Sequence, residues 1–248
     1  MRTLITGVDG FLGANLARRL LSDGHEVTGA ALNRKGLTSL DALGVDIRLE
    51  YGDVTDTAYV DRLVNAYEPE VIFHLAAVSI IRIADSNPGR ALRTNILGTL
   101  NVVEAAQRHG YKALVASSDK AYGYQAEVYT EDMALKPTGA YEVSKASADM
   151  IARLYGAVVL RCANLFGPAD LNWSRLIPNS CRLALDGKPP MVYEGAWDIQ
   201  REWLDVDSAV NAYLLLASEG IPGEAYNVGS GETITAGEMA QTVARIIG

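Results

Sequence analysis

The sequence predicts a doubly wound parallel α/β sheet followed by a small C-terminal lobe. Short apolar runs alternate with segments of helical periodicity over the first two thirds of the chain, which is the pattern of right-handed βαβ units. The chain also opens with a strand, a glycine turn and a helix in immediate succession. Its 248 residues, 49% hydrophobic and 21% charged, are enough for one large α/β domain and exclude a disordered or disulfide-stapled chain.

Short apolar runs mark the expected strands. The run over 46–51 alternates with period two, whereas the run over 71–75 is continuously apolar, as in a central parallel strand. The expected strands cover 3–6, 26–32, 46–51, 71–75, 113–116 and 158–160.

Apolar positions at helical spacing mark the helices between these strands. Leu12, Leu16 and Leu20 recur at intervals of four and predict a helix that stops near Gly24. Further helices are expected over 57–67, from Asn87-Pro88 to Gly110, and over 141–155.

The rhythm changes after Gly167, where prolines and tryptophans interrupt the simple alternation. A helix over 205–218 and a strand over 226–228 are still expected. We therefore divide the chain into a core domain over 1–166 and a smaller lobe over 167–248, some of whose segments return to the core sheet.

Charge and composition exclude several classes of partner. The net charge of −8 argues against a general nucleic-acid surface, and no apolar run approaches the roughly 20 residues that span a bilayer. The first strand follows Met1-Arg2 directly, which leaves no room for a signal peptide. Cys162 and Cys181 lack the spacing of metal ligands. We expect a cytoplasmic protein with no nucleic-acid, membrane or metal partner.

A glycine turn joins the first strand to the first helix. Its pattern, Gly7-x-x-Gly10-x-x-Gly13, permits a tight turn and lets backbone N–H groups approach a pyrophosphate at the positive end of the helix. In this position the pattern predicts a dinucleotide-binding site.

The ends of the second and third strands bear on which dinucleotide is bound. The second strand lacks the acidic residue that ordinarily holds the adenosine ribose, and it ends in Asn33 and Arg34. Asn33 could bond a ribose hydroxyl, which favours NAD, whereas Arg34 could pair with the 2′-phosphate of NADP. Asp53, at the end of the third strand, is placed to meet the adenine amino group.

A tyrosine and a lysine lie four residues apart on one face of a predicted helix. Tyr141 and Lys145 bring a phenol close to an ammonium, which lowers a tyrosine pKa from its usual value of about 10. Such a phenol can act as a general base on a hydroxyl while hydride leaves the same carbon. The strand that ends at Ser117-Ser118-Asp119-Lys120 precedes this pair by about twenty residues.

Further motifs accompany these two along nearly the whole chain: His74-Leu75-Ala76-Ala77, Asn95, Ser118-Asp119-Lys120-Ala121-Tyr122-Gly123 and Arg161-Cys162-Ala163-Asn164-Leu165-Phe166-Gly167-Pro168. In this order they resemble the extended short-chain dehydrogenases/reductases, the nucleotide-sugar epimerase/dehydratase family. The combination is specific although each motif alone is weak. The resemblance implies a Rossmann domain that binds dinucleotide over 1–166 and a lobe that mainly binds nucleotide sugar over 167–248.

The resemblance implies NAD as cofactor, with NADP left open, and a nucleotide-diphosphate sugar as substrate. The implied cofactor-binding residues are Gly7, Gly10, Phe11, Leu12, Gly13, Asn33, Arg34, Asp53, Val54, Leu75, Ala76, Ala77, Asn95, Tyr141 and Lys145. The implied substrate-binding residues are Ser79, Asn164, Arg175 and Arg201.

The substrate residues differ in how well they match. Asn164 precedes a Gly-Pro turn, and Arg201 begins a segment that approximates the family's phosphate-binding arginine motif. The planar guanidinium suits two phosphate oxygens. Arg175 is a weaker candidate and, like Lys188, is more readily interpreted as a surface cation. Four other residues are expected to be packing residues first: Trp197, Trp203, Cys162 and His74.

The two residues after Ser118 distinguish the 4,6-dehydratases of the family from its 4-epimerases. Asp119-Lys120 resembles the pair in CDP-glucose 4,6-dehydratases and in some UDP-N-acetylglucosamine dehydratases, whereas sugar 4-epimerases usually carry small residues there. The resemblance thus implies an NAD-dependent 4,6-dehydratase. In such an enzyme Ser118 binds the C4 hydroxyl and Tyr141 takes its proton. Lys145 lowers the pKa of Tyr141 and binds the ribose of the cofactor.

The elimination step falls to the other two catalytic residues. Asp119 protonates the leaving C6 hydroxyl, and Lys120 acts either as the base at C5 or as a group that steadies an enolate. Two alternatives remain open: a 4-epimerase or 4-ketoreductase that uses Ser118, Tyr141 and Lys145 alone, and a non-catalytic NAD-binding protein.

Two departures from the family's pattern concern lengths. The stretch from Lys145 to Val158 is shorter than usual, and the chain ends where relatives normally continue into the sugar-binding lobe. A shortened substrate lobe is therefore expected. The resemblance also implies a homodimer formed through the helices that begin near Asn87 and Tyr141, and these departures put that pairing in question.

Overall fold

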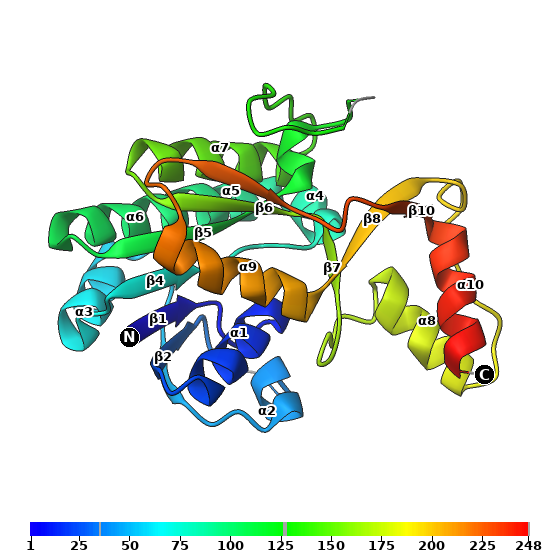
Figure 1. The fold of residues 1–248 in the computed structure, drawn as a ribbon, viewed down its shortest axis with the longest axis horizontal. Helices are drawn as coiled ribbons and strands as arrows, with labels where there is room; N and C mark the ends of the chain where they lie inside the picture. Colours follow the sequence, from blue (N-terminus) through cyan, green and yellow to red (C-terminus); the bar gives the residue numbers. More distant parts are fainter. Residues whose placement is uncertain (35, 126–127, 248) are drawn as a thin grey trace.

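The computed structural model describes residues 1–34, 36–125 and 128–247. Within these residues, seven parallel strands form one sheet in the order β3-β2-β1-β4-β5-β6-β9 (Figure 1). This confirms the doubly wound parallel sheet. The strands are β1 (Arg2–Thr6), β2 (Glu26–Ala31), β3 (Arg48–Tyr51), β4 (Val71–His74), β5 (Lys112–Ser118), β6 (Val158–Cys162) and β9 (Ala225–Val228).

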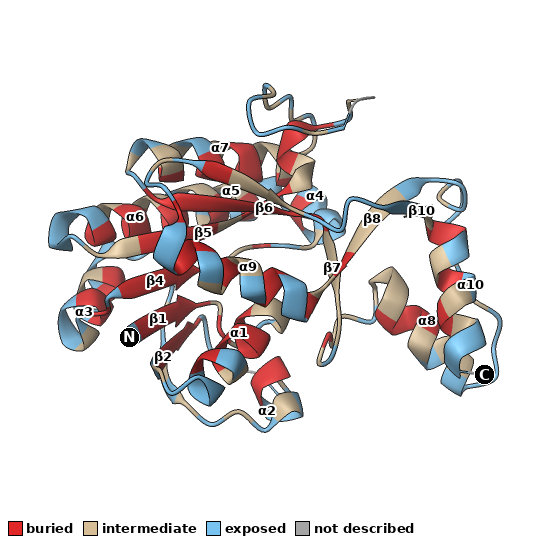
Figure 2. Cartoon of the chain, viewed as in Figure 1, coloured by how far each residue is buried: buried red, intermediate tan, exposed pale blue. Residues whose placement is uncertain are grey.

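Helices cover both faces of this sheet, and buried apolar residues fill the two layers between (Figure 2). One face carries α1 (Phe11–Ser22), α2 (Ser39–Leu43) and α9 (Val206–Glu219). The other face carries α3 (Thr57–Tyr67), α4 (Ile81–Ser86), α5 (Pro88–Leu92), α6 (Gly98–His109) and α7 (Ala140–Leu154).

The long helix expected from Asn87-Pro88 to Gly110 is present but not uniform. A π-helical turn over Arg93–Leu97 joins α5 to α6. An extra residue in one turn of a helix leaves no mark in apolar periodicity, so the sequence did not predict it. π-Turns are frequent at functional sites, and this one carries Asn95.

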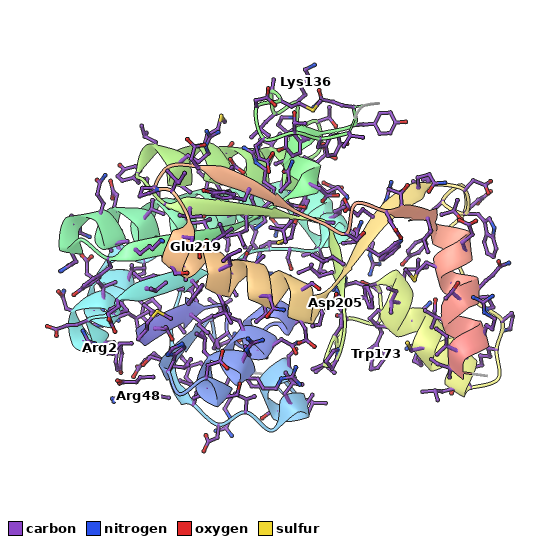
Figure 3. All side chains as sticks on the ribbon, viewed as in Figure 1. Arg2, Arg48, Lys136, Trp173, Asp205 and Glu219 are labelled. Carbon is purple, nitrogen blue, oxygen red and sulfur yellow. The ribbon has the colours of Figure 1, made fainter. Side chains whose placement is uncertain are left out.

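The C-terminal lobe contains elements that the sequence analysis missed. A second sheet has the order β10-β8-β7, built from β7 (Asn164–Phe166), β8 (Gln200–Asp205) and β10 (Thr233–Thr235). Beside it, α8 (Leu176–Leu185) packs against α10 (Ala236–Ile247). The chain then uses Asp205, at the junction of β8 and α9, to cap α9 as it returns to the main sheet (Figure 3).

One buried histidine makes the stability of the fold depend on pH. Thr99 Oγ1 donates to Asn95 O at 2.6 Å and therefore accepts from His74 Nε2 at 3.1 Å, which leaves His74 Nδ1 to accept from Thr6 Oγ1 at 2.8 Å. His74 is neutral in this arrangement. Burial, and then the charge of Lys145, lower the pKa of His74 to about 3.

Acid should therefore destabilise the protein through His74. The unfolded chain binds a proton near pH 6.5 and the folded chain does not, so stability is complete above that pH and is lost as the pH falls toward 3. By pH 5 the loss should reach about 2 kcal/mol. Urea unfolding at pH 7 and pH 5 measures it, and His74→Gln should show a smaller loss. Equal losses in the two proteins would rule out His74 as the source.

Candidate active site

The carboxyl ends of the central strands open into a cavity of about 1040 Å³ that reaches from the glycine turn to the C-terminal lobe. A second cavity of about 300 Å³ adjoins it and shares Gly7, Ala76 and Ala77 with it. The first cavity is lined by sixteen of the site residues predicted from the sequence: Gly7, Gly10, Phe11, Leu12, Gly13, Leu75, Ala76, Ala77, Ser79, Ser118, Asp119, Lys120, Tyr141, Lys145, Asn164 and Arg175.

The glycine turn fits a dinucleotide pyrophosphate. Gly7 has a φ of +72°, and a Cβ there would lie 2.7 Å from Ala76 N; a Cβ on Gly13 would lie 2.5 Å from Gly7 O. Only glycine allows this close packing. Gly10 is the N-cap of α1 and offers no side-chain acceptor to the first N–H groups of the helix. A helix N-terminus that its own N-cap side chain leaves uncapped suits an anion.

Filling the turn should abolish tight NAD binding. The branched side chain of Gly10→Val would occupy the space in front of the α1 N-terminus, since a Cβ at Gly10 already meets Gly7 O at 3.3 Å. We expect the Kd for NAD, measured by calorimetry, to rise at least about a hundredfold through the lost phosphate contacts. Thermal unfolding without ligand serves as the folding control. An unchanged Kd would make the turn purely structural.

The second cavity lies at the end of the predicted adenosine site. Asp53 and Val54 line it as expected, and one Asp53 carboxylate oxygen already accepts from Thr55 N at 2.9 Å. Asn33 and Arg34 are exposed and lie outside the described lining of both cavities, directly after Leu32, which lines the second; their predicted contacts with the adenosine ribose stay predictions. The second cavity is also lined by two arginines that no motif indicated, Arg90 and Arg93.

Asn95 is a correction to the predicted cofactor contacts. It is buried, and its carboxamide is consumed by protein partners: Oδ1 accepts from Val78 N at 2.7 Å, and Nδ2 donates to Val78 O and to Ser144 Oγ. Neither cavity has Asn95 in its described lining. The π-turn directs the side chain inward, where it fixes the segment after β4 to α7.

Tyr141 and Lys145 lie together at the cavity, on the first turns of α7. Lys145 Nζ donates to Ala116 O at 2.8 Å. Burial raises the pKa of Tyr141 to about 12 against the opposing effect of its hydrogen bond with Ser118, and burial lowers the pKa of Lys145 to about 8. The predicted lowering of the tyrosine pKa by Lys145 is therefore wrong for the unliganded protein, because the desolvation of the phenol outweighs nearby charges.

Ser118, Asp119 and Lys120 form a compact polar group where β5 ends. Ser118 Oγ donates to Asp119 Oδ1 at 2.9 Å and accepts from Lys120 N at 3.2 Å. Asp119 and Lys120 form an ion pair, with their side chains only 20% and 22% exposed. All three line the cavity beside Tyr141, so an acid–base pair lies within the space that could hold a substrate.

A buried ion pair supports this group from behind. The Arg161 guanidinium binds both carboxylate oxygens of Asp149 at 2.9 Å and donates to Tyr122 OH at 2.6 Å. Arg161 and Asp149 are almost completely buried. Tyr122 ends the short 3₁₀ turn that begins at Asp119, so this network fixes the turn that carries the acid–base pair.

Breaking that pair should be costly. Asp149→Asn leaves the Arg161 charge buried without its counterion, and we expect a loss of about 3–5 kcal/mol in the free energy of unfolding. Asp61→Asn, which breaks the exposed pair with Arg108, is the matched control and should cost about 1 kcal/mol or less. Urea denaturation measures both, and similar losses in the two variants would contradict this interpretation.

The substrate side is only partly as predicted. Asn164 donates to Glu202 O at 2.9 Å and lines the cavity. Arg175 also lines it, pairs with Asp170 at 2.6 Å and lies over the Phe11 ring, so it is not an ordinary surface cation. Arg201 lies near the start of β8, opposite Ile234 of β10, and outside the described lining of the cavity. It shares a face of β8 with Trp203, which does line the cavity, so its predicted contact with the diphosphate stays a prediction.

The two tryptophans expected in the core differ. Trp197 packs against Gly237 at the edge of the lobe and is therefore still 42% exposed. The expectation that Trp197 is a buried core residue is wrong. Trp203 is partly buried and lines the cavity, with its indole N–H unpartnered within the described residues. Cys162 and His74 are buried, as expected.

Comparison with known proteins decides the family. A model of the "NAD dependent epimerase/dehydratase family" matches residues 3–229. The chain belongs to this family. NAD is therefore the family's cofactor, as predicted. A "dTDP-glucose 4,6-dehydratase" from Neisseria meningitidis serogroup B is 31% identical over 99% of this chain and 76% of its own length. Another of the same name, from Mycobacterium tuberculosis, is 33% identical over 93% of this chain and 72% of its own length.

Solved structures agree with this placement. A dTDP-glucose 4,6-dehydratase from Bacillus anthracis, in complex with NAD, superposes with a TM-score of 0.88 at 26% identity, over 99% of this chain and 81% of its own. A UDP-glucose 4-epimerase from Thermotoga maritima, with UDP-glucose, gives 0.89 at 28% identity, over 100% and 82%. These four relatives are thus named for dTDP-glucose and UDP-glucose rather than for CDP-glucose.

None of the helices within the described part of the chain combines the length and the apolar character needed to cross a membrane.

Proposed function

We propose that the protein is an NAD-dependent nucleotide-sugar 4,6-dehydratase. The observation that carries the proposal is the Asp119–Lys120 ion pair, which lies in the same cavity as Ser118, Tyr141 and Lys145. Oxidation at C4 requires only the last three residues. An acid–base pair beside them is what a subsequent elimination requires, and relatives at 31–33% identity carry the name dTDP-glucose 4,6-dehydratase.

The cofactor would lie along the two cavities. The Gly7–Gly13 turn would hold its pyrophosphate, and Asp53 and Val54 would line the space for its adenine. Arg90 and Arg93 would line the adenosine end as well. When bound, NAD supplies an acceptor for the hydrogen that leaves C4 and later returns it to C6.

Tyr141 and Ser118 act on the C4 hydroxyl. Ser118 Oγ accepts from Lys120 N and can turn its proton to the substrate, which holds the hydroxyl next to the Tyr141 phenol. Tyr141 removes the hydroxyl proton as hydride departs. Because burial raises the pKa of Tyr141 to about 12, removal requires added positive charge near the phenol, and Arg175 already acts in that direction.

Asp119 and Lys120 complete the elimination. The ketone at C4 acidifies the C5 hydrogen. If the shared proton of the ion pair first passes from Lys120 to Asp119, the neutral Lys120 amine can accept the C5 proton; if Lys120 keeps its charge, it steadies the enolate instead. Protonated Asp119 then delivers its proton to the departing C6 hydroxyl, so that water leaves and a C5–C6 double bond forms. Hydride then adds at C6 and a proton at C5. The net change is loss of one water with no cofactor consumed.

The substrate is a hexose joined to a nucleoside diphosphate. Arg175 and Asn164, at the lobe side of the cavity, are the groups we place on the diphosphate. Relatives favour dTDP-glucose, whereas the Asp119-Lys120 pair resembles that of CDP-glucose enzymes. Incubation with NAD and dTDP-, CDP- and UDP-glucose in turn tests the assignment. A 4-keto-6-deoxy product from one of them supports it, and no product from any contradicts it.

A 4-epimerase is the second candidate. The structural likeness to a UDP-glucose 4-epimerase is as close as that to the dehydratases, and the Ser118, Tyr141 and Lys145 set serves either reaction. This enzyme would invert C4 without releasing water, and Asp119 would have no proton to deliver.

We also propose that two copies pair through α5, α6 and α7. Leu97, Met150 and Leu154 are exposed along this helical region, at 40%, 57% and 79%. Such a set of apolar side chains is typical of a subunit contact. Light scattering of the full chain measures the association directly.

A further inference from the structure

The Tyr213 hydroxyl, beneath the cavity floor, has no oxygen or nitrogen partner among the described residues. Tyr213 lies on α9 at 0% exposure, with its ring packed edge-to-face on Phe73. Within the described part of the chain its hydroxyl meets only the Cys162 thiol, and sulfur is a weak hydrogen-bond partner. Tyr213 nonetheless lines the large cavity. A buried donor without an acceptor is costly, so this one calls for an explanation.

The hydroxyl lies beneath the centre of the site. Ser118 of β5 is paired with Cys162 of β6, and residues paired in adjacent strands point to the same face. Cys162 lines the large cavity together with Ser118, Tyr141 and Lys145. The Tyr213 hydroxyl, beside that thiol, is therefore placed under the proposed reaction centre on the α9 side of the sheet.

We propose that the Tyr213 hydroxyl donates a hydrogen bond to the carboxamide of the nicotinamide ring and so orients that ring beneath the substrate. This inference rests on the proposed function. Hydride exchange requires the ring to lie next to the carbon whose hydroxyl Ser118 and Tyr141 hold, and the carboxamide is the ring's polar substituent. Burial raises the pKa of Tyr213 well above its ordinary value, so the phenol stays protonated and can donate.

Two ligands that differ in the nicotinamide test the contact. NAD and ADP-ribose share the adenosine, pyrophosphate and second ribose, and only NAD carries the nicotinamide. Tyr213→Phe removes one oxygen and keeps the ring in place. We expect calorimetry to show about two- to tenfold weaker binding of NAD, the range of one neutral hydrogen bond, with ADP-ribose unchanged.

Without ligand, Tyr213→Phe should keep its thermal stability, whereas a variant that loses a structural hydrogen bond should be less stable. Because the hydroxyl meets no more than the weak Cys162 thiol within the described residues, Tyr213→Phe should unfold at the same temperature as the parent or higher. Tyr226→Phe is the matched control. Its ring packs against the same core and its hydroxyl accepts from Ile221 N, remote from the cavity, so it should change neither Kd.

The outcomes separate this inference from the proposed function. If the parent protein binds NAD and Tyr213→Phe leaves its affinity unchanged, or weakens NAD and ADP-ribose equally, the nicotinamide contact is overturned while the proposed function stands. If the parent protein does not bind NAD, both are overturned. Selective weakening of NAD, with no loss of thermal stability, supports the contact.

Discussion

Tyr141→Phe should reduce turnover of the accepted nucleotide sugar by a factor of about 10²–10⁴, the usual worth of a positioned general base. The phenol is buried beside Ser118, the residue proposed to hold the C4 hydroxyl. The change removes one oxygen and keeps the ring, so the protein should fold and bind NAD as before. Steady-state kinetics and calorimetry measure the two effects separately.

Tyr155→Phe is the control for this change. Tyr155 ends the same helix, and its hydroxyl donates to Glu104 Oε1, remote from the cavity. Its turnover should stay within a few-fold of the parent. If the turnover of Tyr141→Phe also stayed within a few-fold of the parent, the proposal of hydride transfer at this site would be wrong.

Asp119→Asn should separate elimination from oxidation. The amide keeps the shape and can still meet Ser118, but it cannot deliver a proton to a leaving C6 hydroxide. Oxidation at C4 should therefore proceed while product formation falls by about 10²–10⁴-fold. Rapid mixing with substrate should then show the absorbance of reduced nicotinamide building up without product.

Asp119→Glu provides the matched comparison, because it keeps a transferable proton and should retain more activity than the amide. In an epimerase or ketoreductase, Asp119→Asn should lose little turnover, since neither reaction needs a proton from Asp119. Near-parental turnover by Asp119→Asn would thus remove the dehydratase assignment and leave Tyr141 and Lys145 as oxidoreductive residues.

The Rossmann core was predictable because its signals are local. The strand at 3–6, the Gly7–Gly13 turn and the helix with Tyr141 and Lys145 each depend on a few neighbouring residues, and the structure places all of them as expected. Parallel strands then bring their carboxyl ends to one edge, which gathers the catalytic set without further information.

The lobe and the finer chemistry were less predictable because they depend on distant contacts. The strand β8 lies between β7 and β10, so its place in the lobe depends on pairing with segments about 30 to 40 residues away on either side. The π-turn buries Asn95 and presents Arg93 instead. The Tyr141 pKa depends on the burial of its phenol, which the sequence does not encode as a pattern. Tyr213 belongs to no motif, and only the fold brings it under the cavity.

The fate of the hydrogen at C4 tests the proposed reaction in one measurement. The protein is incubated with NAD and a nucleotide glucose that carries deuterium at C4, and the product is examined by NMR. A 4,6-dehydratase moves the label from C4 to C6 and releases one water. Deuterium at C6 of a 4-keto-6-deoxy sugar is the predicted result. Deuterium retained at C4 of an inverted sugar would contradict it.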